Sequence, residues 1–331
     1  MSRKIFMSRK IFSTLSCAVL LAATLTGVTT AQAAEETALP SLIRIVVPAA
    51  PGSSTDTLGR AVAHQLSSRL GSNVIVENKP GVSTMLGSAM VAKGPTDGSM
   101  LLINSTSLVS TAATMADPLL DVVNDLRPVA LLEENPLVVA TSLKSDIKTP
   151  AELVTAARKD MVTHGTVGVG SIAHFAQVLF SHAAGIEMMH VPYKGTALAV
   201  TDMAGGNIDS VIATWTTVAP AINSGHARAI AVTSAEPNPA FPDLPTLNSV
   251  APGFSLSLWI GFFAPSGTPD AIVERLNREI NAVSESEALR SIFENDGGVP
   301  LQMTPAEISQ RVRNDFDMFK KASTGKEFST R

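Results

Sequence analysis

The stretch from Ile43 to Leu70 constrains the fold more than any other part of the sequence. It opens on an apolar run ending at Val47, rich in Val and Ile, as in strands that are covered on both faces. Pro48 and Pro51 cannot donate ladder hydrogen bonds, so the strand must end there. Apolar residues then recur at helical spacing up to Leu70, which indicates an amphipathic helix. The folded chain therefore begins as a strand, a loop and a helix.

The loop between this strand and this helix has the composition of an anion site. Ser53 stands three residues before Asp56, close to a capping box, so the helix should begin near Ser53 or Ser54. Its first N–H groups, the nearby hydroxyls and the positive end of the helix dipole would converge on one small volume. Pro, Gly and Ser are also ordinary turn residues, so this loop alone leaves both interpretations open. Asp56 is better explained as a helix-start residue than as a catalytic carboxylate.

The same pattern of strand, polar loop and helix recurs along the chain. Parallel strands separated by helices predict an α/β fold, in which ligands bind at the carboxyl ends of the strands. Loops rich in Ser, Thr and Gly follow several predicted strands, and Pro-rich residues 237–252 exclude regular helix or central sheet. The predicted strands are 74–76, 100–104, 126–132, 137–140, 166–169, 188–191, 208–213, 227–233 and 256–264, and the predicted helix caps are Ser83, Thr149, Ser171 and Thr304.

The N-terminal residues predict export. Four basic residues precede an apolar run over residues 15–28, and Ala31-Gln32-Ala33 is a small-x-small pattern, so residues 1–33 resemble a secretory signal peptide cleaved after Ala33. This segment holds four of the 25 basic residues and none of the 29 acidic ones, which leaves a net charge of −8 on the rest. Such a charge disfavours nucleic-acid binding. The remaining 298 residues suffice for two domains.

A dinucleotide fingerprint competes with the anion-loop interpretation. Residues 168–173 read Gly-Val-Gly-Ser-Ile-Ala between a predicted strand and helix, with Glu187 beyond them. An exported enzyme, most sharply a dinucleotide-dependent oxidoreductase, is therefore the alternative function. The match is short, however, and Ser171 also serves as a plain helix cap. His174 and His182 are two turns apart, too far to share a metal without a third ligand, so we expect no metal site.

Five motifs, taken in order, resemble the solute-binding proteins of tripartite tricarboxylate transporters, the Bug family. The resemblance spans almost all of the chain after the predicted signal peptide. The motifs are residues 45–56, Val-Glu-Asn-Lys-Pro-Gly at 76–81, His-Val-Pro-Tyr-Lys-Gly at 190–195, Ala-Ile-Ala-Val-Thr-Ser at 229–234, and Gly-Phe-Phe-Ala-Pro-Ser-Gly-Thr-Pro at 261–269.

The resemblance implies a two-lobed type II periplasmic-binding-protein fold with a ligand cleft between the lobes. Lobe 1 would comprise residues 34–138 and 258–331, and lobe 2 residues 139–257, with crossings near 136–141 and 256–262. The implied function is a monomeric periplasmic receptor, not an enzyme and without a cofactor. It would capture a small di- or tricarboxylate and deliver it to the membrane permease subunits of the transporter.

The resemblance also implies a site without a dedicated arginine, in which backbone groups and ordered water of the first loop hold one carboxylate. Two departures, Ala49 or Ala50 for an aromatic residue and Ser83-Thr84-Met85 for Gly-Gly-Asn, favour a roomier or more apolar pocket. A longer or aromatic dicarboxylate would suit such a pocket. We expect Lys194 to be a solvated residue at its edge. The predicted ligand-binding residues are Pro51, Gly52, Ser53, Ser54, Thr55, Asp56, Ser105, Thr106, Gly170, Ser171, Gly195, Thr196 and Thr214.

Overall fold

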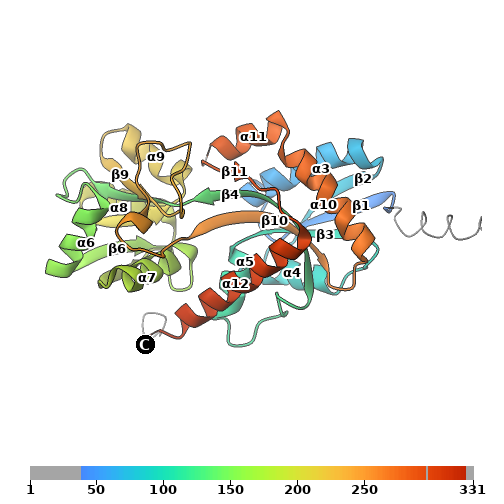
Figure 1. Cartoon of the computed structure of the whole chain (residues 1–331), viewed down its shortest axis with the longest axis horizontal. Helices are drawn as coiled ribbons and strands as arrows, with labels where there is room; N and C mark the ends of the chain where they lie inside the picture. Colours follow the sequence, from blue (N-terminus) through green and yellow to red (C-terminus); the bar gives the residue numbers. More distant parts are fainter. Residues whose placement is uncertain (1–38, 296, 326–331) are drawn as a thin grey trace, which may run out of the picture.

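The strands of the protein form two sheets in two lobes, and two long strands run between the lobes (Figure 1). The computed structural model describes residues 39–295 and 297–325. The predicted signal peptide lies outside these residues. Helices alternate with strands, so the predicted two-lobed α/β class is confirmed. No helix in residues 39–295 or 297–325 combines the length and the apolar character that a membrane crossing requires.

The first sheet has the strand order β11-β4-β10-β3-β1-β2. β1 runs parallel to β2 and β3, so their carboxyl ends lie at one edge. β10 runs antiparallel to β3, with Ile260 opposite Ser105, which places the carboxyl end of β3 near the start of β10. The strands are β1 (Leu42–Val47), β2 (Asn73–Asn78), β3 (Met100–Ser105), β4 (Leu126–Pro136), β10 (Ser257–Pro265) and β11 (Val299–Pro300).

The second sheet has the strand order β7-β6-β8-β5-β9. β6 runs parallel to β7 and β8, so these three strands also end at one edge. Val138, the first residue of β5, lies opposite Ala213 at the end of β8, and this edge is therefore next to the entry of the chain into the lobe. The strands are β5 (Val138–Ser142), β6 (Val162–Thr166), β7 (Met188–Pro192), β8 (Ser210–Ala213) and β9 (Ala227–Val232).

Hydrogen bonds around Leu137 and Thr233 tie the two crossing segments together. Leu137, between β4 and β5, donates its N–H to Oγ1 of Thr233 at 2.8 Å, and the Thr233 N–H donates to the Leu137 carbonyl at 2.9 Å. On the return crossing the Leu256 N–H donates to the Thr233 carbonyl at 3.0 Å, one residue before β10 begins. Because the carboxyl edges of both sheets adjoin these crossings, the two edges face each other.

Capping side chains explain where several helices begin. The Ser53 hydroxyl accepts the Asp56 N–H, and Thr304 forms a reciprocal capping box with Glu307, as predicted. The helices are α3 (Ser54–Leu70), α4 (Met85–Ala92), α5 (Ser107–Thr114), α6 (Pro150–Lys159), α7 (Ile172–Ala184), α8 (Thr196–Gly205), α9 (Trp215–Asn223), the 3-10 helix η1 (Leu247–Ser249), α10 (Asp270–Ser284), α11 (Glu287–Glu294) and α12 (Pro305–Ser323).

The predicted cap of α4 is wrong. The helix begins at Met85, and Ser83 has a left-handed backbone with φ of 49°, whereas an N-cap residue requires an extended one. Val82 and Thr84 on either side are left-handed as well, with φ of 46° and 76°. Such conformations cost about 1–3 kcal/mol each, and they persist where the surrounding fold enforces them. The sequence also does not predict α5, α9 and α11.

Helix α12 connects the lobes through the hydrophobic core. It runs from the first lobe toward α7 of the second (Figure 1), where the rings of Phe319 and Phe175 pack with centroids 4.6 Å apart. Both rings are buried in a core cluster that contains residues of both sheets, such as Leu102 and Ile212. Smaller core clusters lie on the other face of each sheet. The lobes therefore share packed side chains in addition to the two crossing strands.

Candidate functional site

The predicted ligand-binding residues form two groups, one at the carboxyl edge of each sheet. Residues 51–56, Ser105 and Thr106 follow β1 and β3, which are neighbours in the first sheet. Residues 170–171, 195–196 and Thr214 follow β6, β7 and β8, which are neighbours in the second. The sheet registers thus gather each group on its own lobe and place the two groups on facing edges.

In the first loop, Asp56 acts as an internal brace. Its side chain is only 3% exposed and accepts hydrogen bonds from the Gly52 N–H at 2.9 Å and from the Asn78 amide at 2.8 Å. Arg60 lies 3.0 Å away in an ion pair. Hydrogen bonding from Arg60, then from Gly52, lowers the pKa of Asp56 to about 2 although burial opposes the shift. The carboxylate is therefore ionised and fully engaged in holding the loop.

Next to this brace, backbone N–H groups at the start of α3 are open. Within the described residues, the N–H groups of Ser54 and Thr55 donate to no acceptor. The Asp56 N–H, by contrast, is taken by the Ser53 hydroxyl at 3.2 Å. Free N–H groups at a helix N-terminus attract anions because the dipole adds to their partial charge. The loop thus offers an anion two backbone donors, and the nearby Arg60 is already paired.

Thr106 has a structural task at the hinge. Its buried hydroxyl accepts the Trp259 N–H at 2.8 Å, and its own N–H donates to the Trp259 carbonyl at 3.0 Å, which fixes the start of α5 to β10. The neighbouring Ser105 hydroxyl accepts the Ser107 N–H at 3.3 Å. Thr106 also lines a cavity of about 530 Å³ between the crossing strands, α12 and residues 234–239.

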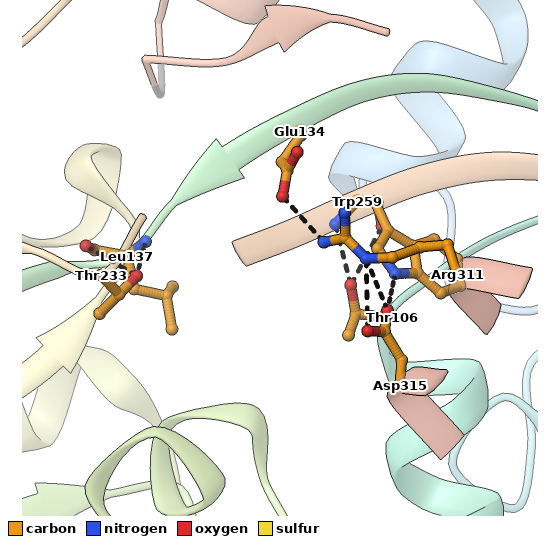
Figure 2. Close-up of polar contacts among 7 residues, drawn as sticks. All are labelled: Thr106, Glu134, Leu137, Thr233, Trp259, Arg311 and Asp315. Carbon is orange, nitrogen blue, oxygen red and sulfur yellow. Dashed lines mark hydrogen bonds and ion pairs between the residues drawn. The ribbon is translucent and has the colours of Figure 1, made fainter. Parts of the chain in front are cut away.

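Arg311 of α12 links this helix to both crossing strands, as Figure 2 shows. Its guanidinium lies 2.8 Å from Glu134 of β4 and 3.3 Å from Asp315. Asp315 in turn accepts the indole N–H of Trp259, on β10, at 2.8 Å. This network and Thr106 lie on the first-lobe side of the crossing (Figure 2). Leu137 and Thr233 lie on the other side.

The second lobe repeats the geometry of the first loop after β6. Gly52 and Gly170 have φ of +83° and +81°, and each precedes a serine cap. Ser171 accepts the His174 N–H at 3.3 Å, as Ser53 accepts that of Asp56. The His174 Nδ1 then accepts the Gly170 N–H at 3.3 Å. His174 therefore occupies the bracing position that Asp56 holds in the first lobe.

Three histidines converge beneath the second loop, which sequence reasoning missed because they lie on different elements. His174 and His190 stack with ring centroids 4.1 Å apart, and His164 of β6 is fully buried nearby. Burial, followed by the charge of neighbouring histidines, lowers the pKa of His164 to about 3 and that of His174 to about 4. Within the described residues, no group of three His, Cys, Asp or Glu side chains is arranged to hold a metal ion.

The remaining predicted residues of the second lobe start α8 and α9. Within the described residues, the N–H groups of Thr196 and Ala197 have no acceptor, so α8 offers open donors like those of α3. Gly195 lies just before them as the N-cap residue. The Thr214 hydroxyl bonds to the hydroxyl of Thr217 at 2.9 Å, within the first turn of α9.

The glycine fingerprint has a side chain of the other lobe next to its second glycine. It lies between β6 and α7, as a dinucleotide motif would. A Cβ on Gly170, however, would meet the side chain of Thr114, from α5 of the other lobe, at 3.4 Å. The space that the second glycine of such a motif leaves for phosphate is thus next to a protein side chain. The fingerprint is better explained by the tight turn and its serine cap.

Comparisons with known proteins agree with this architecture. Residues 58–322 match the family model described as tripartite tricarboxylate transporter family receptor. The UPF0065 protein in the tcbD-tcbE intergenic region of Pseudomonas sp. (strain P51) is 36% identical over 77% of this chain and 79% of its own length. Protein BugT of Bordetella pertussis is 34% identical over 80% of this chain and 82% of its own.

Solved structures of solute-binding proteins are also similar. A TctC solute-binding protein from Polaromonas, without ligand, has a TM-score of 0.77 at 26% identity and covers 85% of this chain and 97% of its own. Rpa4515 of R. palustris with adipate has a TM-score of 0.71 at 28% identity, and the match covers 86% of this chain and 96% of that one. MatC from Rhodopseudomonas palustris with bound malate has a TM-score of 0.68 at 26% identity, and the match covers 85% of this chain and 98% of that one. The chain belongs to the Bug family of tripartite tricarboxylate transporter receptors, which are periplasmic solute-binding proteins.

Proposed function

We propose that this protein captures a dicarboxylate between its two lobes and delivers it to the membrane permease subunits of a tripartite tricarboxylate transporter. The observation that carries the proposal is the pair of facing edges with open helix N-termini, at Ser54 and Thr55 on one lobe and at Thr196 and Ala197 on the other. Two separate sets of donors suit a ligand that has an anionic group at each end. Lobe closure around the crossing segments would bring both sets to one ligand.

Backbone donors would supply most of the binding in this proposal. Arg60, beside the first loop, is paired with Asp56 and Asn78. Lys79 at the neighbouring turn is paired with Glu77 at 2.6 Å. Lys194 is exposed just before the helix α8. A site whose nearby cations are paired or solvated relies on N–H groups and hydroxyls.

Apolar side chains favour a ligand with an extended apolar body. Large hydrophobic residues lie exposed in the loops and the first helical turns that follow the carboxyl ends of β2, β6 and β7. Exposed apolar groups on a ligand-facing edge stabilise apolar parts of a ligand by about 25 cal/mol per Å² buried. A longer aliphatic or aromatic dicarboxylate would bury more of this surface than a short hydroxy acid. The exposed hydrophobic residues that follow β2, β6 and β7 have exposed fractions between 43% and 56%, and they are Val82, Leu86, Val167, Val169 and Leu198.

Calorimetric titration tests the proposal. The chain without the predicted signal peptide, residues 34–331, is titrated with adipate, malate, an aromatic dicarboxylate and NAD. We expect adipate and the aromatic acid to bind at least about tenfold more tightly than malate, a difference of about 1.4 kcal/mol. Binding of NAD without binding of any dicarboxylate would overturn the receptor function.

A matched pair of variants tests the apolar contribution. Val169→Ser, in the loop after β6, should weaken adipate binding several-fold. Met161→Ser serves as the control, because Met161 is 61% exposed at the opposite end of the same strand. Equal losses in the two variants would contradict a role of the apolar loop residues.

A further inference from the structure

The two loops that carry a Gly-Ser turn are braced by groups of opposite character. In the first, the brace is the ionised carboxylate of Asp56, which has Arg60 as a partner. In the second, the brace is the imidazole of His174, whose Nδ1 accepts the Gly170 N–H. An Nδ1 that accepts a hydrogen bond carries no proton, so this brace exists only in the neutral form of His174. The second loop therefore depends on the protonation state of a side chain that the ligand need not touch.

His190 supports the same loop through Thr166. Its Nε2 lies 2.5 Å from the Thr166 hydroxyl, and that hydroxyl accepts the Gly168 N–H at 3.1 Å. The ring of His190 also stacks on that of His174 at 4.1 Å. Protonation of either ring would place a charge against its neighbour, and His174 is fully buried. The two histidines thus fix the two glycine N–H groups that shape the turn.

We propose that His174 and His190 are positioning residues of the Gly168–Ser171 loop, and that the loop keeps its ligand-binding form only while His174 is neutral. This inference rests on the proposed function in assigning the loop to ligand capture. Acidification would release the loop and weaken ligand binding, so that the receptor gives up its ligand more readily at low pH.

The surroundings of the cluster set the direction of the effect. The pKa of each of the three histidines lies below its ordinary value, with burial as the first cause. The titratable groups that act on them are the histidines themselves, since His190 depresses the pKa of both others. From β8 the cluster meets the neutral hydroxyl of Ser210, 3.0 Å from Nδ1 of His164. Within the described residues, no carboxylate is among the causes of these shifts, so burial and the neighbouring rings decide their direction.

Substitutions can separate the hydrogen bonds from the titration. His174→Asn keeps an acceptor near the position of Nδ1 and cannot be protonated in this range. His190→Gln likewise keeps a polar group near Nε2. His174→Phe retains the ring but removes the acceptor. His182→Asn is the control, because His182 is exposed in the last turn of the same helix.

The first readout needs no ligand. The amide resonances of Gly168 and Gly170 are followed by NMR from pH 7.5 to 3, which spans the His174 pKa of about 4. We expect both to move with a common midpoint in the protein and in His182→Asn, and to stay fixed in the His174→Asn/His190→Gln double variant. In His174→Phe the Gly170 amide should already be displaced at pH 7.5. Amides that stay fixed in the protein, or that move equally in the double variant, would overturn the proposal.

The second readout is the affinity for adipate at pH 7 and pH 3.5, on either side of the His174 pKa of about 4. The ratio of the affinities of the protein and the double variant cancels protonation of adipate itself. We expect this ratio to fall at least about threefold between the two pH values, and a constant ratio would overturn the link to binding. If adipate and the other dicarboxylates bind at no pH while the amides still titrate, the proposed function fails and the histidine brace stands.

Discussion

The loop after β1 and the loop after β6 have the same backbone turn, but chemically different side chains hold it in place. Both have a left-handed glycine, a serine cap and, three residues after the cap, a side chain that reaches back to the glycine N–H. The first loop uses Asp56, beside Arg60, which is half exposed to solvent. The second uses His174 in a fully buried position between other histidines. A carboxylate without a cation would be costly there, whereas a neutral imidazole is not.

One backbone motif can therefore respond to acid at different pH values, depending on the side chain that braces it. The Asp56 carboxylate keeps its charge until the pH approaches its pKa of about 2. In the second loop, burial lowers the pKa of His174 to about 4. The contribution of His174 to the free energy of unfolding therefore decreases as the pH falls below about 6.5. On acidification, the second lobe should therefore loosen before the first.

The largest expected effect is on stability in acid. His164 stays neutral in the folded state to about pH 3, while the unfolded chain takes up a proton below about 6.5. Its folded pKa is lowered, so the free energy of unfolding should fall as pH drops from 6.5, by about 2 kcal/mol at pH 4.5 from His164 alone. Urea unfolding at both pH values measures this. In His164→Asn the fall should be smaller by that amount, and an unchanged pH slope would refute the assignment.

A smaller effect is expected when the charge of the first brace is removed. Asp56→Asn should lower the free energy of unfolding at pH 7 by about 1 kcal/mol, because the exposure of Arg60 to solvent weakens the pair. The pKa of Asp56 is lowered, so its contribution is present above about pH 4 and lost as pH falls toward 2. The variant and the protein should therefore differ at pH 7 and converge in acid. A difference that persists to pH 2 would assign the effect to packing instead of charge.

The smallest effects concern the caps that both loops share. Ser53→Ala and Ser171→Ala each remove an acceptor for one helix N–H and should each cost about 1 kcal/mol of unfolding free energy. Ser171→Ala should cost somewhat more at pH 7 by thermal or urea unfolding, because the Ser171 hydroxyl also donates to the Gly168 carbonyl at 2.8 Å. A larger loss in Ser53→Ala than in Ser171→Ala would contradict this comparison of the two caps.

Local sequence signals predicted much of the fold. The cap at Ser53, the capping box at Thr304 and the strand from Leu42 to Val47 depend on neighbours within a few residues, and the structure has them as predicted. Short helices were harder to predict from local signals. α5 spans eight residues without a side-chain cap, and α9 contains Pro220, so neither has a clear periodic pattern. The left-handed turn at Val82 has no sequence signal, since β-branched residues rarely adopt it.

The candidate site was predictable as loops but not as a set of contacts. Strand order brings residues 51–56 and 170–171 to facing edges, and the sequence pattern had already marked both. The meeting of His164, His174 and His190 requires β6, β7 and α7 to pack together, which one sequence does not specify. The role of Asp56 needs Asn78, 22 residues away in sequence. Tertiary packing decides which polar residues are braces and which remain open to a ligand.

A calorimetric titration of adipate into Gly52→Val and Lys194→Met tests whether backbone donors capture the ligand. Gly52 has φ of +83°, so valine would distort the loop that presents the Ser54 and Thr55 N–H groups. Gly71→Val is the matched control, because Gly71 has φ of +65° and open space at the other end of α3. If backbone donors hold the ligand, Gly52→Val should lose more than about 100-fold in affinity, roughly 2.7 kcal/mol, while Gly71→Val and Lys194→Met change it only slightly. If Lys194→Met abolishes binding and Gly52→Val retains it, side-chain charge captures the ligand and capture by backbone donors is refuted.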